Sequence, residues 1–107
     1  MANVFKNAAV AIGTSATTLY TAPAATTGII HAIYISNVDG TNDASVDITV
    51  TDTSAGATYH IMKTVSVPAD STLVIEKPIN LEPTDVLKVK ASAAGDLEAF
   101  VSVLEMT

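Results

Sequence analysis

The stretch that decides the fold reads GIIHAIYISN over residues 28–37, VDGTNDA over 38–44 and SVDITVTD over 45–52. In the first part, bulky side chains occupy both the odd-numbered and the even-numbered positions, which predicts a strand covered on both faces. In the last part, Val46, Ile48 and Val50 alternate with polar residues, as is typical of a strand with one wet face. Asp39 and Gly40 between them favour a tight turn, so we predict that the two strands form an antiparallel hairpin.

The rest of the chain continues as short β-rich segments separated by turn residues. Further strands are predicted at residues 2–12, 17–22, 57–67, 72–77, 86–92 and 97–106, with turns at 54–56 and 68–71 and a hairpin turn at 93–96. No segment keeps the i, i+3, i+4, i+7 spacing of an amphipathic helix. About eight strands with turn signals every 8–12 residues or so are typical of a sandwich or barrel. We therefore predict one all-β domain over residues 1–107, an antiparallel β-sandwich of jelly-roll or immunoglobulin-like type.

The residues at the inward-facing positions of these strands predict a shared aliphatic core. Its members are Ile33, Ile48, Val50, Leu73, Leu87, Val89 and Val101. The chain has five aromatic residues, Phe5, Tyr20, Tyr34, Tyr59 and Phe100, about as many as one core needs. A carbohydrate site needs exposed aromatic rings, so it has no support in the sequence.

Composition removes several classes of function. The chain has no cysteine, so disulfides and thiolate zinc sites are excluded. Five lysines, no arginine and a net charge of −6 argue against a nucleic-acid partner, because phosphate backbones are bound by clustered cations. Gly13, Thr26 and Pro23 are among the residues that interrupt the long uncharged stretch before Asp39, so no membrane span is expected. A signal peptide is not expected either, since Lys6 is the only cation ahead of a short apolar run.

The sequence offers no convincing catalytic or metal site. His31 and His60 would need to converge with a carboxylate such as Asp47 or Asp52 to bind a metal, and strand positions facing solvent or a neighbouring chain are the preferred explanation. There is no G-x-S-x-G motif, so no nucleophile is assigned. The loop 39–43 is rich in oxygen ligands but departs from the calcium-loop pattern, and its residues are those that ordinary turns prefer. We expect a non-enzymatic protein with no catalytic, cofactor-binding or metal-binding residues, and no cofactor.

Several short phrases recur in a recognisable order. They are TLYTAPA at 18–24, an Ile-rich strand ending in Ser36-Asn37, the alternating stretch 46–50, VPADSTL at 67–73, LEPTDVL at 81–87, Ala91-Ser92, Gly95 and a final strand with Ser102-x-x-Glu105. This order resembles a group of bacteriophage structural proteins of about a hundred residues. The resemblance spans nearly the whole chain, and it implies a virion component with no catalytic residues to carry over.

The resemblance favours a head decoration or cement protein that binds and stabilises the capsid shell. The alternative is a tail or baseplate module, including a receptor-binding one. The implied partners are the major capsid protein or other virion subunits, and the implied location is the outer surface of the head, or the tail. Residues 1–12 carry apolar side chains at both odd-numbered and even-numbered positions. Lys6 is the only charged residue in the segment that would protect a sheet edge from pairing. We therefore predict that this segment is an assembly arm covered by another chain, with a homotrimer as the first expectation.

Overall fold

Alternating Val, Ile and Thr side chains fold the chain into strands alone. The computed structural model describes residues 2–107, and every regular element in that range is a β-strand. The strands are β1 (Asn3–Ala11), β2 (Thr17–Thr21), β3 (Thr27–Asn37), β4 (Ala44–Asp52), β5 (Ala57–Val67), β6 (Thr72–Ile75), β7 (Ile79–Leu81), β8 (Val86–Ala91) and β9 (Leu97–Met106). The all-β prediction is confirmed. The structure has no helix in this range that is long and apolar enough to cross a bilayer.

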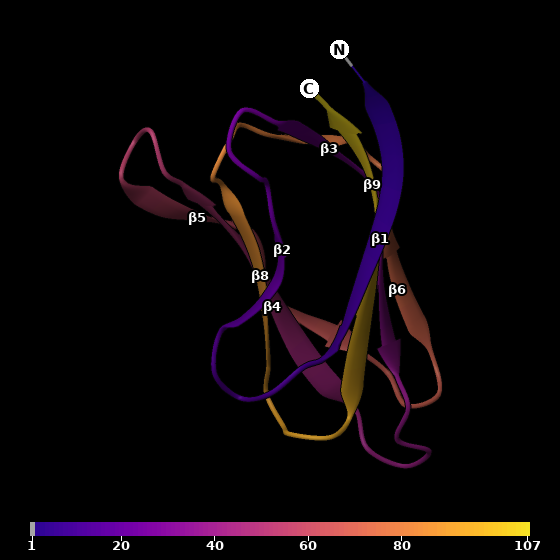
Figure 1. Cartoon of the computed structure of the whole chain (residues 1–107). Helices are drawn as coiled ribbons and strands as arrows, with labels where there is room; N and C mark the ends of the chain where they lie inside the picture. The colour runs from indigo at the N-terminus through magenta and orange to yellow at the C-terminus, as the bar shows by residue number, and fades with distance from the viewer. Residues whose placement is uncertain (1) are drawn as a thin grey trace.

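The strands form two antiparallel sheets that pack against each other (Figure 1). Sheet A has the order β1-β9-β3-β6, with β7 also paired to β3, and sheet B has the order β2-β8-β4-β5. The pairing is nested: β1 pairs with β9, β2 with β8, β3 with β6 and β7, and β4 with β5. An antiparallel ribbon rolled up in this way across two sheets is a jelly roll. The predicted sandwich is confirmed, in its jelly-roll form.

The predicted hairpin over residues 28–52 is wrong, because β3 lies in sheet A and β4 in sheet B. Asn37 holds the connection between them. Its buried side-chain amide donates hydrogen bonds to the carbonyl oxygens of Asn42 and Val67, both at 2.9 Å, and its Oδ1 accepts one from the backbone N–H of Asp39. Turn residues reverse the chain equally well in a hairpin and in a crossing between sheets, so the Asp-Gly pair could not distinguish the two.

The hairpin turn predicted at residues 93–96 is wrong for the same reason, since β8 lies in sheet B and β9 in sheet A. By contrast, the turn at residues 54–56 does join a true hairpin, β4 and β5. Gly56 adopts a φ of 69° there, which glycine tolerates without strain.

The sequence predicts that β3 is covered on both faces. In the structure only one face is covered. Its register against β9 shifts between Ile30 and Ala32, so the bulge places Ile30 on the same face as Ile33 and Ile35. These three isoleucines are fully buried, whereas His31 and Tyr34 are exposed. The prediction from strict alternation is wrong here, because one extra residue in a strand moves the side chains after it to the opposite face.

The core between the sheets is aliphatic. Five of the seven predicted core residues are fully buried, while Val50 and Leu73 are half-buried at its margin. Other fully buried members are Ile12, Ile30, Ile35, Val46, Val67, Leu81, Leu97 and Val103. Burying each such side chain contributes roughly 1.5–3 kcal/mol. Branched aliphatic side chains thus make up the buried core.

Candidate interaction surface

The aromatic side chains lie mainly on the surface, contrary to the prediction that they belong to the core. The exposed fractions are 81% for Phe5, 59% for Tyr59, 41% for Phe100 and 39% for Tyr34. Only Tyr20 points between the sheets, where it packs against the core. Large apolar side chains that gather on a surface mark a place where another molecule binds. The sequence could not reveal this. A pattern of apolar residues shows which side chains avoid water, but not whether the core or another molecule buries them.

Three of these four aromatic residues share the outer face of sheet A. The strand registers place Phe5, Leu104 and Ile29 in one cross-strand row, and Ala9, Phe100, Tyr34 and Val74 in another. We call these seven residues the apolar outer face. The second row runs from β1 across β9 and β3 to β6, and the row of Asn7, Ser102 and Ala32 separates it from the first.

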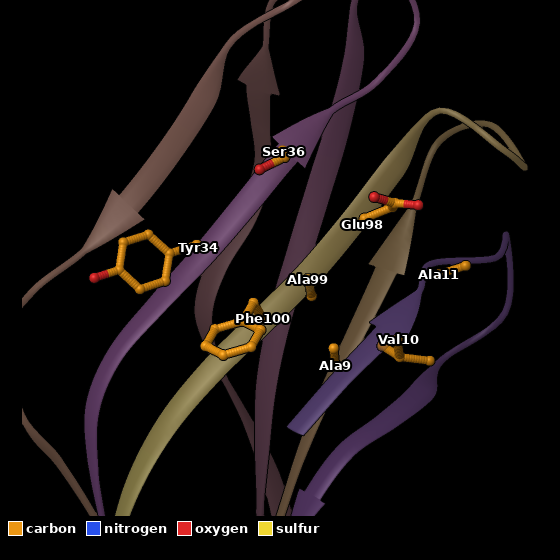
Figure 2. Close-up of a pocket in the computed structure, with 8 residues that line it drawn as sticks. All are labelled: Ala9, Val10, Ala11, Tyr34, Ser36, Glu98, Ala99 and Phe100. Atoms are coloured by element: carbon orange, nitrogen blue, oxygen red, sulfur yellow. The ribbon is translucent and has the colours of Figure 1, made fainter. Parts of the chain in front are cut away.

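A shallow hollow of about 380 Å³ opens on the apolar outer face beside β1 (Figure 2). Its lining residues are Ala9, Val10, Ala11, Tyr34, Ser36, Glu98, Ala99 and Phe100. The rings of Tyr34 and Phe100 stand with their centroids 6.3 Å apart and their planes tilted by 55°. The small side chains of β1 leave the space open next to Phe100, and Glu98 and Ser36 supply the polar groups at one end (Figure 2). The hollow can accept an apolar side chain.

The outer face of sheet B has the opposite character. Asp47 stands beside Lys90 and Thr49 beside Lys88 in the pairing of β4 with β8. Thr51 and Thr58 share a hydrogen bond of 2.9 Å across the hairpin. A face of alternating threonines and opposite charges is well solvated, so one side of the sandwich suits a partner and the other suits water.

A polar cluster joins the two sheets inside the sandwich. The Tyr20 hydroxyl of β2 donates a hydrogen bond of 2.5 Å to Glu105 of β9, and Lys6 Nζ of β1 lies 3.1 Å from the same carboxylate. Glu105 is only 7% exposed, yet the Tyr20 hydroxyl, together with Lys6, lowers the pKa of its carboxyl. Burial, followed by the hydrogen bond to Glu105, raises the pKa of Tyr20. The carboxylate therefore stays ionised and the phenol stays protonated.

Gly28 makes room for this cluster. A Cβ at this position would lie 3.0 Å from Tyr20 Cε2 and 3.1 Å from the Tyr20 hydroxyl. Gly28 is also the β3 partner of Glu105 in the register of sheet A. The glycine that begins the decisive stretch of sequence thus lets a tyrosine of sheet B reach a carboxylate of sheet A.

The residues considered for metal binding do not form one site. His31 lies on β3 of sheet A, and His60 lies on β5 of sheet B. In the loop 39–43, Asp39 Oδ1 accepts hydrogen bonds from the backbone N–H groups of Thr41 and Asn42 at 2.8 and 3.1 Å. These bonds lower the pKa of Asp39 and close the loop as a turn.

One group of three carboxylates occurs among residues 2–107: Asp52, Glu82 and Asp85. Asp85 accepts backbone hydrogen bonds of 2.9 Å from Thr53 and from Glu82, and Asp52 accepts one of 2.8 Å from the hydroxyl of Ser54. The carboxylates thus fasten the β4–β5 turn to the connection before β8, which is a structural role.

No protein-family model matches the chain, and no curated protein matches it. Solved structures resemble it in fold. A chain of the acid-stable capsid of Helicobacter pylori bacteriophage KHP30 superposes with a TM-score of 0.61, covering 100% of this chain and 89% of that one at 11% identity. A pentameric capsid protein from metagenomic phage sequences superposes with a TM-score of 0.41. The match covers 94% of this chain and 62% of that one, at 17% identity. A chain of the virus-like particle of the extra small virus of the prawn Macrobrachium rosenbergii superposes with a TM-score of 0.43. The match covers 100% of this chain and 81% of that one, at 12% identity. The first match shows that the jelly roll is shared, and the other two superpose too loosely to add to it.

Proposed function

We propose that this chain is a non-enzymatic structural protein of a bacteriophage virion, and that it is a head decoration or cement protein. The order of phrases in the sequence supports this, as does a fold shared with a chain of a phage capsid. The two chains are of comparable length, since the superposition spans all of one and 89% of the other. The proposed partner is the major capsid protein or another virion subunit.

The observation that carries the proposal is the contrast between the two outer faces. The apolar outer face of sheet A would lie on the shell, and the polar face of sheet B would lie toward solvent. Exposed aromatic residues are enriched where proteins bind one another, and their burial supplies much of the binding energy. The net charge of −6 also suits a position outside the shell, away from the packaged genome. The proposal assigns no catalytic, cofactor-binding or metal-binding residue and treats residues 1–107 as one domain.

The test is an add-back experiment with particles of the encoding phage that lack this protein. Purified protein should co-sediment with these particles, and Phe100→Glu should weaken that binding at least tenfold, because a charge would have to be desolvated at the contact. Thr49→Glu, which places the same charge on the outer face of sheet B, is the matched control and should bind normally. Equal binding by both variants would sink the proposed orientation.

The tail or baseplate alternative has one observation of its own. The β4–β5 hairpin stands away from the body of the sandwich (Figure 1), and its strand β5 exposes Tyr59 and Ile61 by 59% and 43%. A projecting hairpin with exposed apolar side chains suits contact with a receptor. Electron microscopy of virions labelled with an antibody against the chain distinguishes the two roles, since label on the tail would replace the decoration role with the alternative.

A further inference from the structure

Strand β1 forms one edge of sheet A, and β6 and β7 form the other. The N–H of Ile12 donates to the carbonyl of Leu97 at 2.9 Å, and the N–H of Thr107 donates to the carbonyl of Ala2 at 3.0 Å. Because hydrogen-bonded positions alternate along an antiparallel pair, the even-numbered residues of β1 face β9. The odd-numbered residues direct their N–H and C=O groups away from it, where they have no partner within residues 2–107. They are Asn3, Phe5, Asn7, Ala9 and Ala11.

This edge has little of the usual protection against pairing. Proteins guard open edges with charges, prolines or bulges, yet β1 has no proline, its register against β9 is unbroken, and Lys6 is its only charge. The Lys6 side chain is 54% exposed, but its charge is paired with Glu105 at 3.1 Å, which weakens it as a guard of the edge. The expected edge position of this segment is confirmed.

The same strand carries both a projecting side chain and a space that would fit it. Within residues 2–107, Phe5 is the most exposed of the large apolar side chains, at 81%. Four residues further along β1, Ala9 forms part of the hollow beside Phe100. Both side chains lie on the outer face of sheet A, and so do the uncharged side chains of Asn7 and Ala11. An antiparallel copy of β1 would bring each Phe5 opposite an Ala9.

We propose that the partner of this edge is a second copy of the chain, added by antiparallel pairing of β1 with β1. Asn7 faces Asn7 across a two-fold axis, Phe5 pairs with the partner's Ala9, and Asn3 pairs with the partner's Ala11. Each Phe5 ring then enters the hollow of the other copy and approaches the partner's Phe100. The contact is self-complementary, as a two-fold interface requires. We choose this register because Ala9 is the residue of β1 that pairs with Phe100.

The pairing joins the two copies of sheet A into one sheet. The two-fold axis of an antiparallel pair is perpendicular to the sheet, so both apolar outer faces lie on the same side. The paired sheet presents both outer faces on the side that the proposed function assigns to the shell, although the pairing itself does not depend on that function. A two-fold contact closes after two copies, and it therefore predicts a dimer where the sequence analysis expected a trimer.

The first test is the mass of the purified full chain in solution, by sedimentation equilibrium. The chain should be dimeric, and Phe5→Ser and Ala9→Glu should each raise the dimer dissociation constant at least tenfold. Tyr59→Ser is the matched control, since it removes an exposed aromatic ring from the edge strand of the other sheet. A chain that stays monomeric at about 1 mM, where even a millimolar contact would be half-formed, overturns the proposal. So does a trimer, or a control variant that dissociates like Phe5→Ser.

The second test uses the absence of cysteine from the chain. Facing residues of an antiparallel pair lie about 4.5–5.5 Å apart between Cα atoms, which a disulfide spans. Asn7→Cys should therefore form a covalent dimer on mild oxidation. Asn3→Cys is on the same strand and the same face, but the two Asn3 positions would lie about 27 Å apart along the strands. Efficient cross-linking of Asn3→Cys, or none of Asn7→Cys in a dimeric sample, would show that the register is wrong. Because both tests use purified protein, they succeed or fail independently of binding to the shell.

Discussion

At the scale of single residues, Glu105 shows how a buried charge is retained. Taking a carboxylate out of water is costly unless partners replace the lost hydration. Tyr20 supplies a hydrogen bond from the opposite sheet, and Lys6 supplies a countercharge from the neighbouring strand. Gly28 supplies the space in which the tyrosine reaches the carboxylate. The cluster links β1, β2 and β9 at one point.

Replacing Tyr20 with phenylalanine tests this link. The substitution keeps the ring but leaves the buried carboxylate without its neutral donor, so we expect a loss of about 1–3 kcal/mol in the free energy of unfolding. Urea unfolding followed by circular dichroism measures it. Tyr59→Phe, on the exposed strand β5, is the control and should change stability by less than about 0.5 kcal/mol. Similar losses in both variants would contradict a special role for Tyr20.

The pKa of Glu105 also predicts a dependence of stability on pH. Its carboxyl pKa is lowered from the usual 4.5 in the folded chain, so the unfolded chain binds a proton more readily. The stabilisation is therefore complete above pH 4.5 and is lost as the pH falls through the lower folded value. In urea unfolding between pH 7 and pH 2.5, Glu105→Gln should lose less stability on acidification than the wild type. A variant whose profile runs parallel to that of the wild type would exclude this contribution.

At the scale of elements, the strands are set by where their apolar side chains can be buried. Strand β4 follows its predicted parity, with Val46 and Ile48 fully buried, whereas β3 needs a bulge to bury Ile30 with Ile33. Strand β1 pairs with β9 along its whole length and leads into the buried Ile12. It is thus part of the sandwich, and point substitutions on its outer face test its role in assembly better than deletion does.

Ile48→Ala is the expected strong core variant. The side chain is fully buried between the sheets, so truncation should cost about 2–5 kcal/mol of unfolding free energy through lost burial and the cavity left behind. Ile61→Ala, on exposed strand β5, removes the same atoms where 43% of the residue is exposed and should cost much less. Thermal or urea unfolding compares the two directly, and equal losses would mean that the core is misassigned.

The loop at residues 39–43 should not respond to calcium. Asp39 already accepts hydrogen bonds from Thr41 and Asn42, so an ion would have to replace contacts that close the turn. We expect the same melting temperature with millimolar calcium and with a chelator, measured by differential scanning fluorimetry. A rise of many degrees with calcium would reveal a binding site, because a ligand that binds only the folded state stabilises it.

At the scale of the whole molecule, the jelly roll pairs the first strand with the last and the second with the last but one. Most of its contacts therefore join residues distant in sequence, and each pair must close a long loop before it is stabilised. We expect refolding from urea in roughly milliseconds to seconds, as for other all-β domains of high contact order. Stopped-flow circular dichroism measures this rate, and refolding within microseconds would be incompatible with the nested pairing.

By itself, the sequence determined the strand content, most strand positions and the inward side chains of β4, β8 and β9. These follow from local properties, namely β-branched residues, alternation with a period of two, and turn residues. Only the tertiary structure decided that the connection after Asn37 crosses between sheets, that the bulge at His31 exchanges the faces of β3, and that Phe5, Tyr34 and Phe100 lie outside. Pairing and burial are settled between segments far apart in the chain. A local pattern shows that a side chain must leave water, but only the arrangement of the whole chain shows whether its own core provides the cover.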